Sequence, residues 1–126
     1  MLIITVSSWE EFEEYLNKYE NVIVNITASW CKPCIAIKPL IKKFINVIEE
    51  PNSIYLVIDH NVYETDNNFD IFFRMKKIPY FIFIKNKKIE ESIVCGDFSI
   101  VSKKIFDFIS INKNNSLDNF SKDDDF

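Results

Sequence analysis

Residues 29–34 read Ser-Trp-Cys-Lys-Pro-Cys, which places two of the three cysteines of the chain three positions apart. Three uses of such a pair are open. The two thiols can form a redox couple, supply two of four ligands to a metal ion, or lie buried without any chemical role. The sequence on either side of the pair separates these uses.

The pair is expected between a buried strand and a helix. Val22 to Thr27 is apolar at nearly every position apart from Asn25, which predicts a central strand with both faces covered. Behind the pair, apolar residues repeat at helical spacing from Ile37 to Ile48. Pro39 falls inside this repeat, and we expect it to kink the helix. Cys31 should therefore lie at a helix N-terminus.

The rest of the chain alternates between strand and helix patterns. Strands are expected over residues 2–6, 54–58, 80–84 and 89–94, and helices after Ser7 or Ser8 and over residues 69–75 and 98–109. Residues 61–68 read as a polar loop, and Asn86 suits a left-handed turn position. This order predicts an α/β fold with a central mixed β-sheet flanked by helices on both faces.

Length, charge and composition limit the class of protein. The chain has 126 residues, which fits one domain, and a net charge of −4, which disfavours nucleic acid as a partner. Neither a signal peptide nor a run long enough for a membrane span is apparent, so we expect no membrane partner and a cytoplasmic location. We expect a domain over residues 1–110 and a polar, disordered tail over residues 111–126.

The pattern around the pair favours redox chemistry. At a helix N-terminus, free backbone N–H groups and the helix dipole stabilise the Cys31 thiolate, which is the nucleophilic form. Cys34 lies one turn further in, within reach of a disulfide and less exposed, and Pro33 suits a first helical turn. We therefore predict that Cys31 attacks a substrate disulfide and that Cys34 resolves the mixed disulfide. No metal or organic cofactor is required.

Three features together resemble the thioredoxin family. Residues 30–34, Trp-Cys-Lys-Pro-Cys, match the Trp-Cys-Gly-Pro-Cys signature of the family with one change. Pro39 matches its helix-kinking proline, and Ile78-Pro79 matches its Ile-Pro pair, whose proline is cis and faces the active site. The resemblance covers roughly residues 1–110.

The resemblance implies a thioredoxin fold and a protein-disulfide oxidoreductase. Its substrates would be disulfide-containing proteins, and an external reductant, by analogy a thioredoxin reductase, would recycle the dithiol for electron transport and redox homeostasis. Trp30, Lys32 and Pro33 would tune the cysteines. Ile78 would offer backbone hydrogen bonds to the substrate chain beside Pro79.

Two positions depart from the family in ways that affect the chemistry. Asn25 stands where the family has a buried Asp, and Tyr55 stands where its lysine partner lies. Because an amide is not a base at neutral pH, we predict slower resolution of the mixed disulfide. Lys32 replaces a glycine. It either favours the thiolate and acidic partner segments or merely points into water.

Cys95 falls where the family has a glycine beside the active site. A one-residue slip would instead bring Gly96 to that place and move Cys95 aside. We expect Cys95 to be a small, buried and unreactive residue.

Two other functions are compatible with the sequence. A structural zinc site needs four ligands, and only Cys31, Cys34, Cys95 and His60 are candidates. Alternatively, the chain is a divergent binding or assembly subunit with little general reductase activity.

Overall fold

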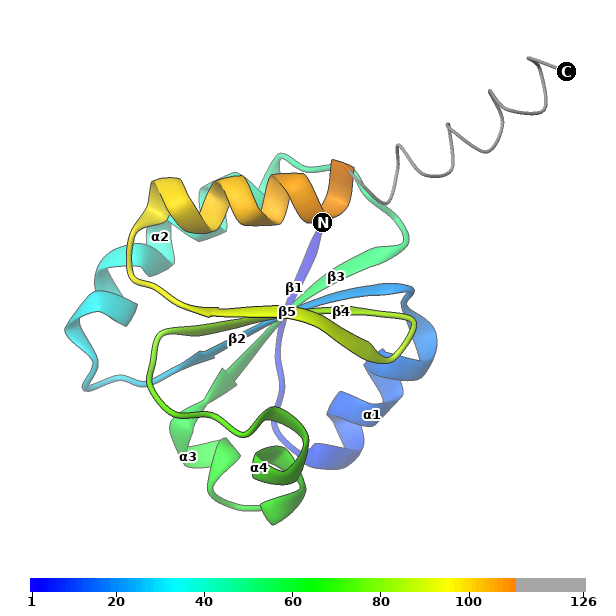
Figure 1. Cartoon of the computed structure of the whole chain (residues 1–126), viewed down its shortest axis with the longest axis vertical. Helices are drawn as coiled ribbons and strands as arrows, with labels where there is room; N and C mark the ends of the chain where they lie inside the picture. Colours follow the sequence, from blue (N-terminus) through cyan, green and yellow to red (C-terminus); the bar gives the residue numbers. More distant parts are fainter. Residues whose placement is uncertain (111–126) are drawn as a thin grey trace, which may run out of the picture.

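The computed structural model describes residues 1–110 as one sheet with helices packed around it (Figure 1). The tail expected over residues 111–126 lies outside the described residues. The strands are β1 (Leu2–Thr5), β2 (Asn21–Thr27), β3 (Ser53–Asp59), β4 (Tyr80–Lys85) and β5 (Lys88–Val94). The helices are α1 (Trp9–Lys18), α2 (Lys32–Asn46), α3 (His60–Tyr63) and α4 (Asn67–Phe73), followed by a helix over residues 98–110.

The five strands form one mixed sheet in the order β1-β3-β2-β4-β5. β1, β3 and β2 run parallel, whereas β4 is antiparallel to β2 and β5 is antiparallel to β4. Figure 1 shows α1, α3 and α4 on one side of the sheet and α2 with the helix over residues 98–110 on the other. The predicted fold class is confirmed.

The centre of the sheet is buried on both faces because β2 carries apolar side chains in both directions. Val24 and Ile26 join the core that packs against α1 and α4. Ile23 joins the core beneath α2 and the last helix. Asn25, which shares the second face with Ile23, is the polar exception within the run. The sequence pattern that predicted a central strand is confirmed.

The first helix begins at Ser8, which decides between the two serines. The Ser8 hydroxyl accepts a hydrogen bond from the Glu11 N–H at 3.1 Å and so satisfies one free donor of the first turn. The Ser7 hydroxyl instead donates to the Glu11 carboxylate at 3.0 Å.

The segment predicted as a polar loop over residues 61–68 is largely helical, so that prediction is wrong. Asp59 caps α3 by accepting from the Asn61 N–H, and Asp66 caps α4 by accepting from the Asn68 N–H. The helix predicted over residues 69–75 therefore begins two residues early, at Asn67. Asp and Asn favour helix starts as well as loops, and here the start prevails.

Candidate active site

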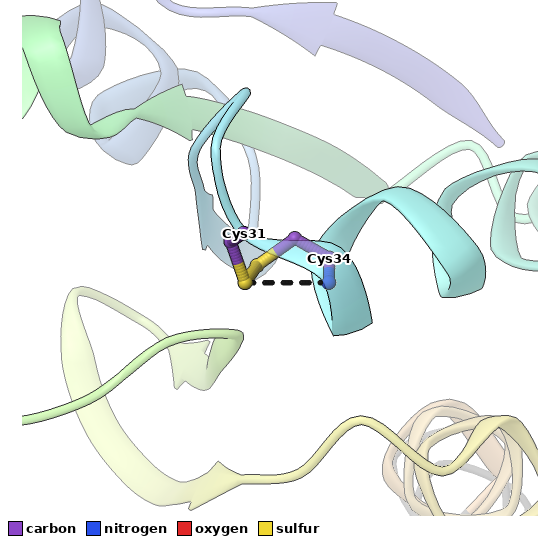
Figure 2. Close-up of a disulfide and its surroundings, with 2 residues drawn as sticks. All are labelled: Cys31 and Cys34. Atoms are coloured by element: carbon purple, nitrogen blue, oxygen red, sulfur yellow. Dashed lines mark hydrogen bonds between the residues drawn. A yellow bond between two sulfur atoms is a disulfide. The ribbon is translucent and has the colours of Figure 1, made fainter.

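The two cysteines lie where the chain passes from β2 into α2. Cys31 is the N-cap of α2, and Cys34 lies in its first turn. They are joined by a disulfide, with 5.2 Å between their Cα atoms (Figure 2). Cys31 is 7% exposed and Cys34 is 3% exposed. The expected reach of a disulfide and the deeper burial of Cys34 are both confirmed.

The helix start points a backbone N–H group at the Cys31 sulfur. The Cys34 N–H donates to Cys31 Sγ at 3.3 Å, drawn as the dashed line in Figure 2. Pro33 occupies the first turn of α2, where its missing N–H breaks no helical bond. That turn contains no acidic residue, and the exposed Lys32 follows Cys31 directly. The helix N-terminus therefore favours a thiolate on Cys31 when the disulfide is reduced.

Ile78 reaches the disulfide from a distant part of the sequence. Ala28, Cys31 and Cys34 form a small buried cluster, and Ile78 packs against it. The Ile78-Pro79 peptide bond is cis, as the resemblance implied, and β4 begins directly after it. The fold thus places the Ile78 side chain against the buried cysteines, at the bend that leads into β4.

Gly96, rather than Cys95, completes the rim of the site. A Cβ atom on Gly96 would lie only 3.0 Å from Pro33 Cβ and 3.9 Å from Pro79 Cγ. The pairing of β4 with β5 shifts by one residue, since Phe83 pairs with Glu91 and Ile84 pairs with Ile89. This bulge adds one residue to β5, and of the two alternatives left open by the sequence the structure has Gly96, not Cys95, beside Pro33 and Pro79.

Cys95 faces away from this rim. Its half-buried side chain packs against the core beneath α2 and the last helix. The Asp97 N–H donates to Cys95 Sγ at 3.4 Å. The expectation that Cys95 is buried is therefore met only in part, and the low reactivity of its thiol stays a prediction.

Trp30 is 65% exposed, and its ring meets the His60 ring edge-on at 5.5 Å between centroids. His60 also lies 3.5 Å from the Glu64 carboxylate. Sequence reasoning missed His60 as a neighbour of the site. Parallel pairing of β2 with β3 could have indicated this contact. The carboxyl ends of the two strands meet at one edge of the sheet, with Thr27 opposite Asp59, so His60 follows β3 close to the motif that follows β2.

Asn25 and Tyr55 form a buried polar pair behind the motif, on β2 and β3. They are 7% and 2% exposed. Within residues 1–110, neither Asn25 Oδ1 nor Tyr55 Oη has a hydrogen-bond partner. Burial raises the pKa of Tyr55 well above its usual range, and the nearby Asn25 amide opposes this rise only in part. Neither side chain is a base at neutral pH.

Two kinds of feature are absent from the described part of the chain. No three side chains of His, Cys, Asp or Glu gather there in a way that could hold a metal ion. None of the helices within residues 1–110 is long and apolar enough to cross a membrane.

The thioredoxin family model matches residues 3–110. The human thioredoxin domain-containing protein 3 is 31% identical over 99 residues, which are 78% of this chain and 16% of that protein. Thioredoxin from Neurospora crassa is 30% identical over 83 residues, which are 66% of this chain and 64% of that protein. The chain thus spans a small part of the human relative and just under two thirds of the fungal one.

Solved structures agree with this match. Reduced thioredoxin from Schistosoma mansoni superposes with a TM-score of 0.73 at 27% identity, covering 86% of this chain and 100% of that one. Oxidised thioredoxin from Plasmodium falciparum has the same fold at 20% identity, with a TM-score of 0.73 over 85% and 98% of the two chains.

Proposed function

The chain belongs to the thioredoxin family, and from this membership we propose that it is a thiol–disulfide oxidoreductase acting on protein disulfides. One observation carries the proposal. Cys31 and Cys34 form a disulfide at the N-terminus of α2, where the helix favours the thiolate that exchange chemistry requires. The alternative of a binding or assembly subunit has no comparable feature in its favour.

The exchange proceeds in two steps that balance. The Cys31 thiolate attacks one sulfur of the substrate disulfide, forms a mixed disulfide and releases the other substrate sulfur as a thiolate. The Cys34 thiolate then attacks Cys31 Sγ and expels the second substrate thiolate. Two electrons have passed to the substrate, and the Cys31–Cys34 disulfide remains. A dithiol reductant must reverse this change before the next turnover.

The neighbouring residues have supporting roles in this proposal. Ile78 and Pro79 hold the substrate chain against the sulfur atoms, because Ile78 packs on the cysteine cluster. Trp30 offers an exposed aromatic contact. Lys32 and Pro33 tune Cys31 from within the first turn of α2, and Asn25 leaves resolution without a buried base.

The partners follow from the same chemistry. We assign disulfide-containing proteins as substrates and a thioredoxin reductase as the source of electrons. A cytoplasmic location fits this role, since the thiols of that compartment are kept reduced.

The first test is reduction of insulin disulfides with dithiothreitol supplied, comparing the wild-type chain with Cys31→Ser. We expect clear turnover that disappears in the variant. A background rate for both proteins would contradict the proposal and favour a binding subunit.

A second test uses Cys34→Ser, which cannot resolve the mixed disulfide. We expect it to trap substrates as covalent adducts that dithiothreitol releases. Only non-covalent partners, unaffected by dithiothreitol, would again favour a binding subunit.

A further inference from the structure

A second site lies beneath α2, apart from the disulfide. A cavity of about 540 Å³ is lined by residues of α2, β1, β2 and β3. Its volume is within the range of roughly 300–1,000 Å³ that is usual for small-molecule sites. Neither cysteine of the motif lines it, nor do Ile78 and Pro79. The cavity is therefore separate from the surface proposed to hold substrate proteins.

The inner end of the cavity carries the unpartnered polar pair. Asn25 and Tyr55 both line it, and both side chains are more than nine-tenths buried. Asn25 Oδ1 is an acceptor, and Tyr55 Oη can donate or accept. Neither atom has a hydrogen-bond partner within residues 1–110, and neither is accessible to solvent, so the two side chains must turn slightly toward a ligand that pairs with them.

The outer end of the cavity is positively charged. Lys38 and Lys42 line it from α2, and their spacing of four residues puts them on one helix face. Both are exposed, and neither forms an ion pair with an acidic group of the described chain. Among residues 1–110, no Asp or Glu side chain lines the cavity. The charge at its mouth therefore favours an anion.

Part of the wall between these two ends is apolar. Ile3 approaches from β1, Val57 from β3 and Ile41 from α2, whereas Thr5, Thr27 and Asn46 add polar groups to the lining. An apolar body of ring size would pack against the three aliphatic side chains. The three regions thus specify a ligand that is anionic at one end, apolar in the middle and hydrogen-bonding at the other end.

We propose that this cavity binds a small organic monoanion with an aromatic body. Its carboxylate lies between Lys38 and Lys42. Its ring packs against Ile41 and the sheet, and a hydroxyl at its far end donates to Asn25 Oδ1. Binding of this kind does not depend on the exchange chemistry of the cysteines, so it stands or fails independently of the proposed function.

The test is a titration of the full chain with a hydroxynaphthoate that carries its hydroxyl and carboxylate at opposite ends. Binding is followed by calorimetry, and its location by amide NMR chemical shifts. We expect saturable shifts at Ile3, Tyr55 and Lys42. Naphthoate lacks the hydroxyl, and naphthol lacks the carboxylate. Each should bind about fivefold more weakly, the usual effect of one lost hydrogen bond or one exposed charge contact.

Matched variants locate the two polar ends. Lys42→Gln should weaken the hydroxynaphthoate by about fivefold, whereas Lys43→Gln, the same change on a neighbouring residue outside the cavity, should not. Asn25→Leu, which removes the acceptor at the inner end, should weaken the hydroxynaphthoate but leave naphthoate unchanged.

Three results would overturn the proposal. One is no binding up to the solubility limit of the probe, which would mean that the cavity holds only solvent. Another is shifts confined to the surface around Trp30. The third is equal weakening by Lys42→Gln and Lys43→Gln, which would show general attraction to a basic helix.

Discussion

In the proposed mechanism, Asn25 limits the rate at which Cys34 resolves the mixed disulfide. It is buried on the strand that leads to the motif, where a carboxylate could accept the proton of Cys34. We predict that Asn25→Asp speeds resolution of the mixed disulfide and raises the insulin reduction rate, measured by stopped-flow and steady-state assays. The new charge is buried, so the variant should also be less stable at neutral than at acid pH.

The control for this prediction is Asn25→Leu, which removes the amide without adding a base. It should not speed resolution. A rate for Asn25→Asp no higher than that of the wild type would show that the proton of Cys34 leaves by another path.

Gly96 is the residue whose size matters most at the rim of the site. An added Cβ would stand 3.0 Å from Pro33 Cβ, a tight contact that Pro33 can relieve only by moving a few tenths of an ångström. We predict that Gly96→Ala displaces the first turn of α2, lowers kcat/KM for insulin and costs about 1–2 kcal/mol of unfolding free energy. Both quantities can be measured on one preparation, by the reduction assay and by urea denaturation.

The neighbouring Cys95→Ala is the control, since its side chain faces the core beneath α2. It should keep kcat/KM near the wild-type value. Full activity of Gly96→Ala would mean that the rim yields easily and that glycine is not needed there.

At the scale of single elements, sequence patterns predicted β1 to β4 because each is an apolar run between polar breaks, and predicted β5 as the strand that returns after the polar turn at Asn86. They failed at α3, where Asp59 begins a helix inside a stretch that reads as loop. They also left Cys95 undecided, because a bulge in the exposed strand β5 leaves no apolar pattern to mark it. The cavity beneath α2 was out of reach, since its two ends converge only in the folded chain.

The cap of α1 gives a prediction at this scale. Ser8→Ala removes the acceptor for the Glu11 N–H and should lower the unfolding free energy by about 1 kcal/mol, measured by urea denaturation. Ser7→Ala is the matched control. Within the described residues, the Ser7 hydroxyl bonds only to the exposed Glu11 side chain, so its loss should have a much smaller effect. Equal losses of unfolding free energy in the two variants would mean that the Ser8 hydroxyl is not the cap of α1.

At the scale of the whole molecule, the sheet separates two cores, and each has to be covered for the fold to hold. One core lies against α1 and α4, and the other lies beneath α2 and the helix over residues 98–110. The helix over residues 98–110 therefore belongs to the cooperative unit, even though it comes last in the described chain. The active site depends on it indirectly, because the same core holds α2 in place.

Substitutions on that helix test this dependence. Ile105 is fully buried in the core beneath α2, whereas Ile100, on the same helix, is half exposed. We predict that Ile105→Ala costs about 2–5 kcal/mol of unfolding free energy, because it leaves a cavity that the sheet cannot close. Ile100→Ala should cost far less. Calorimetry should show one transition for both variants, shifted to lower temperature mainly for Ile105→Ala. A separate early transition would instead mean that the last helix unfolds on its own.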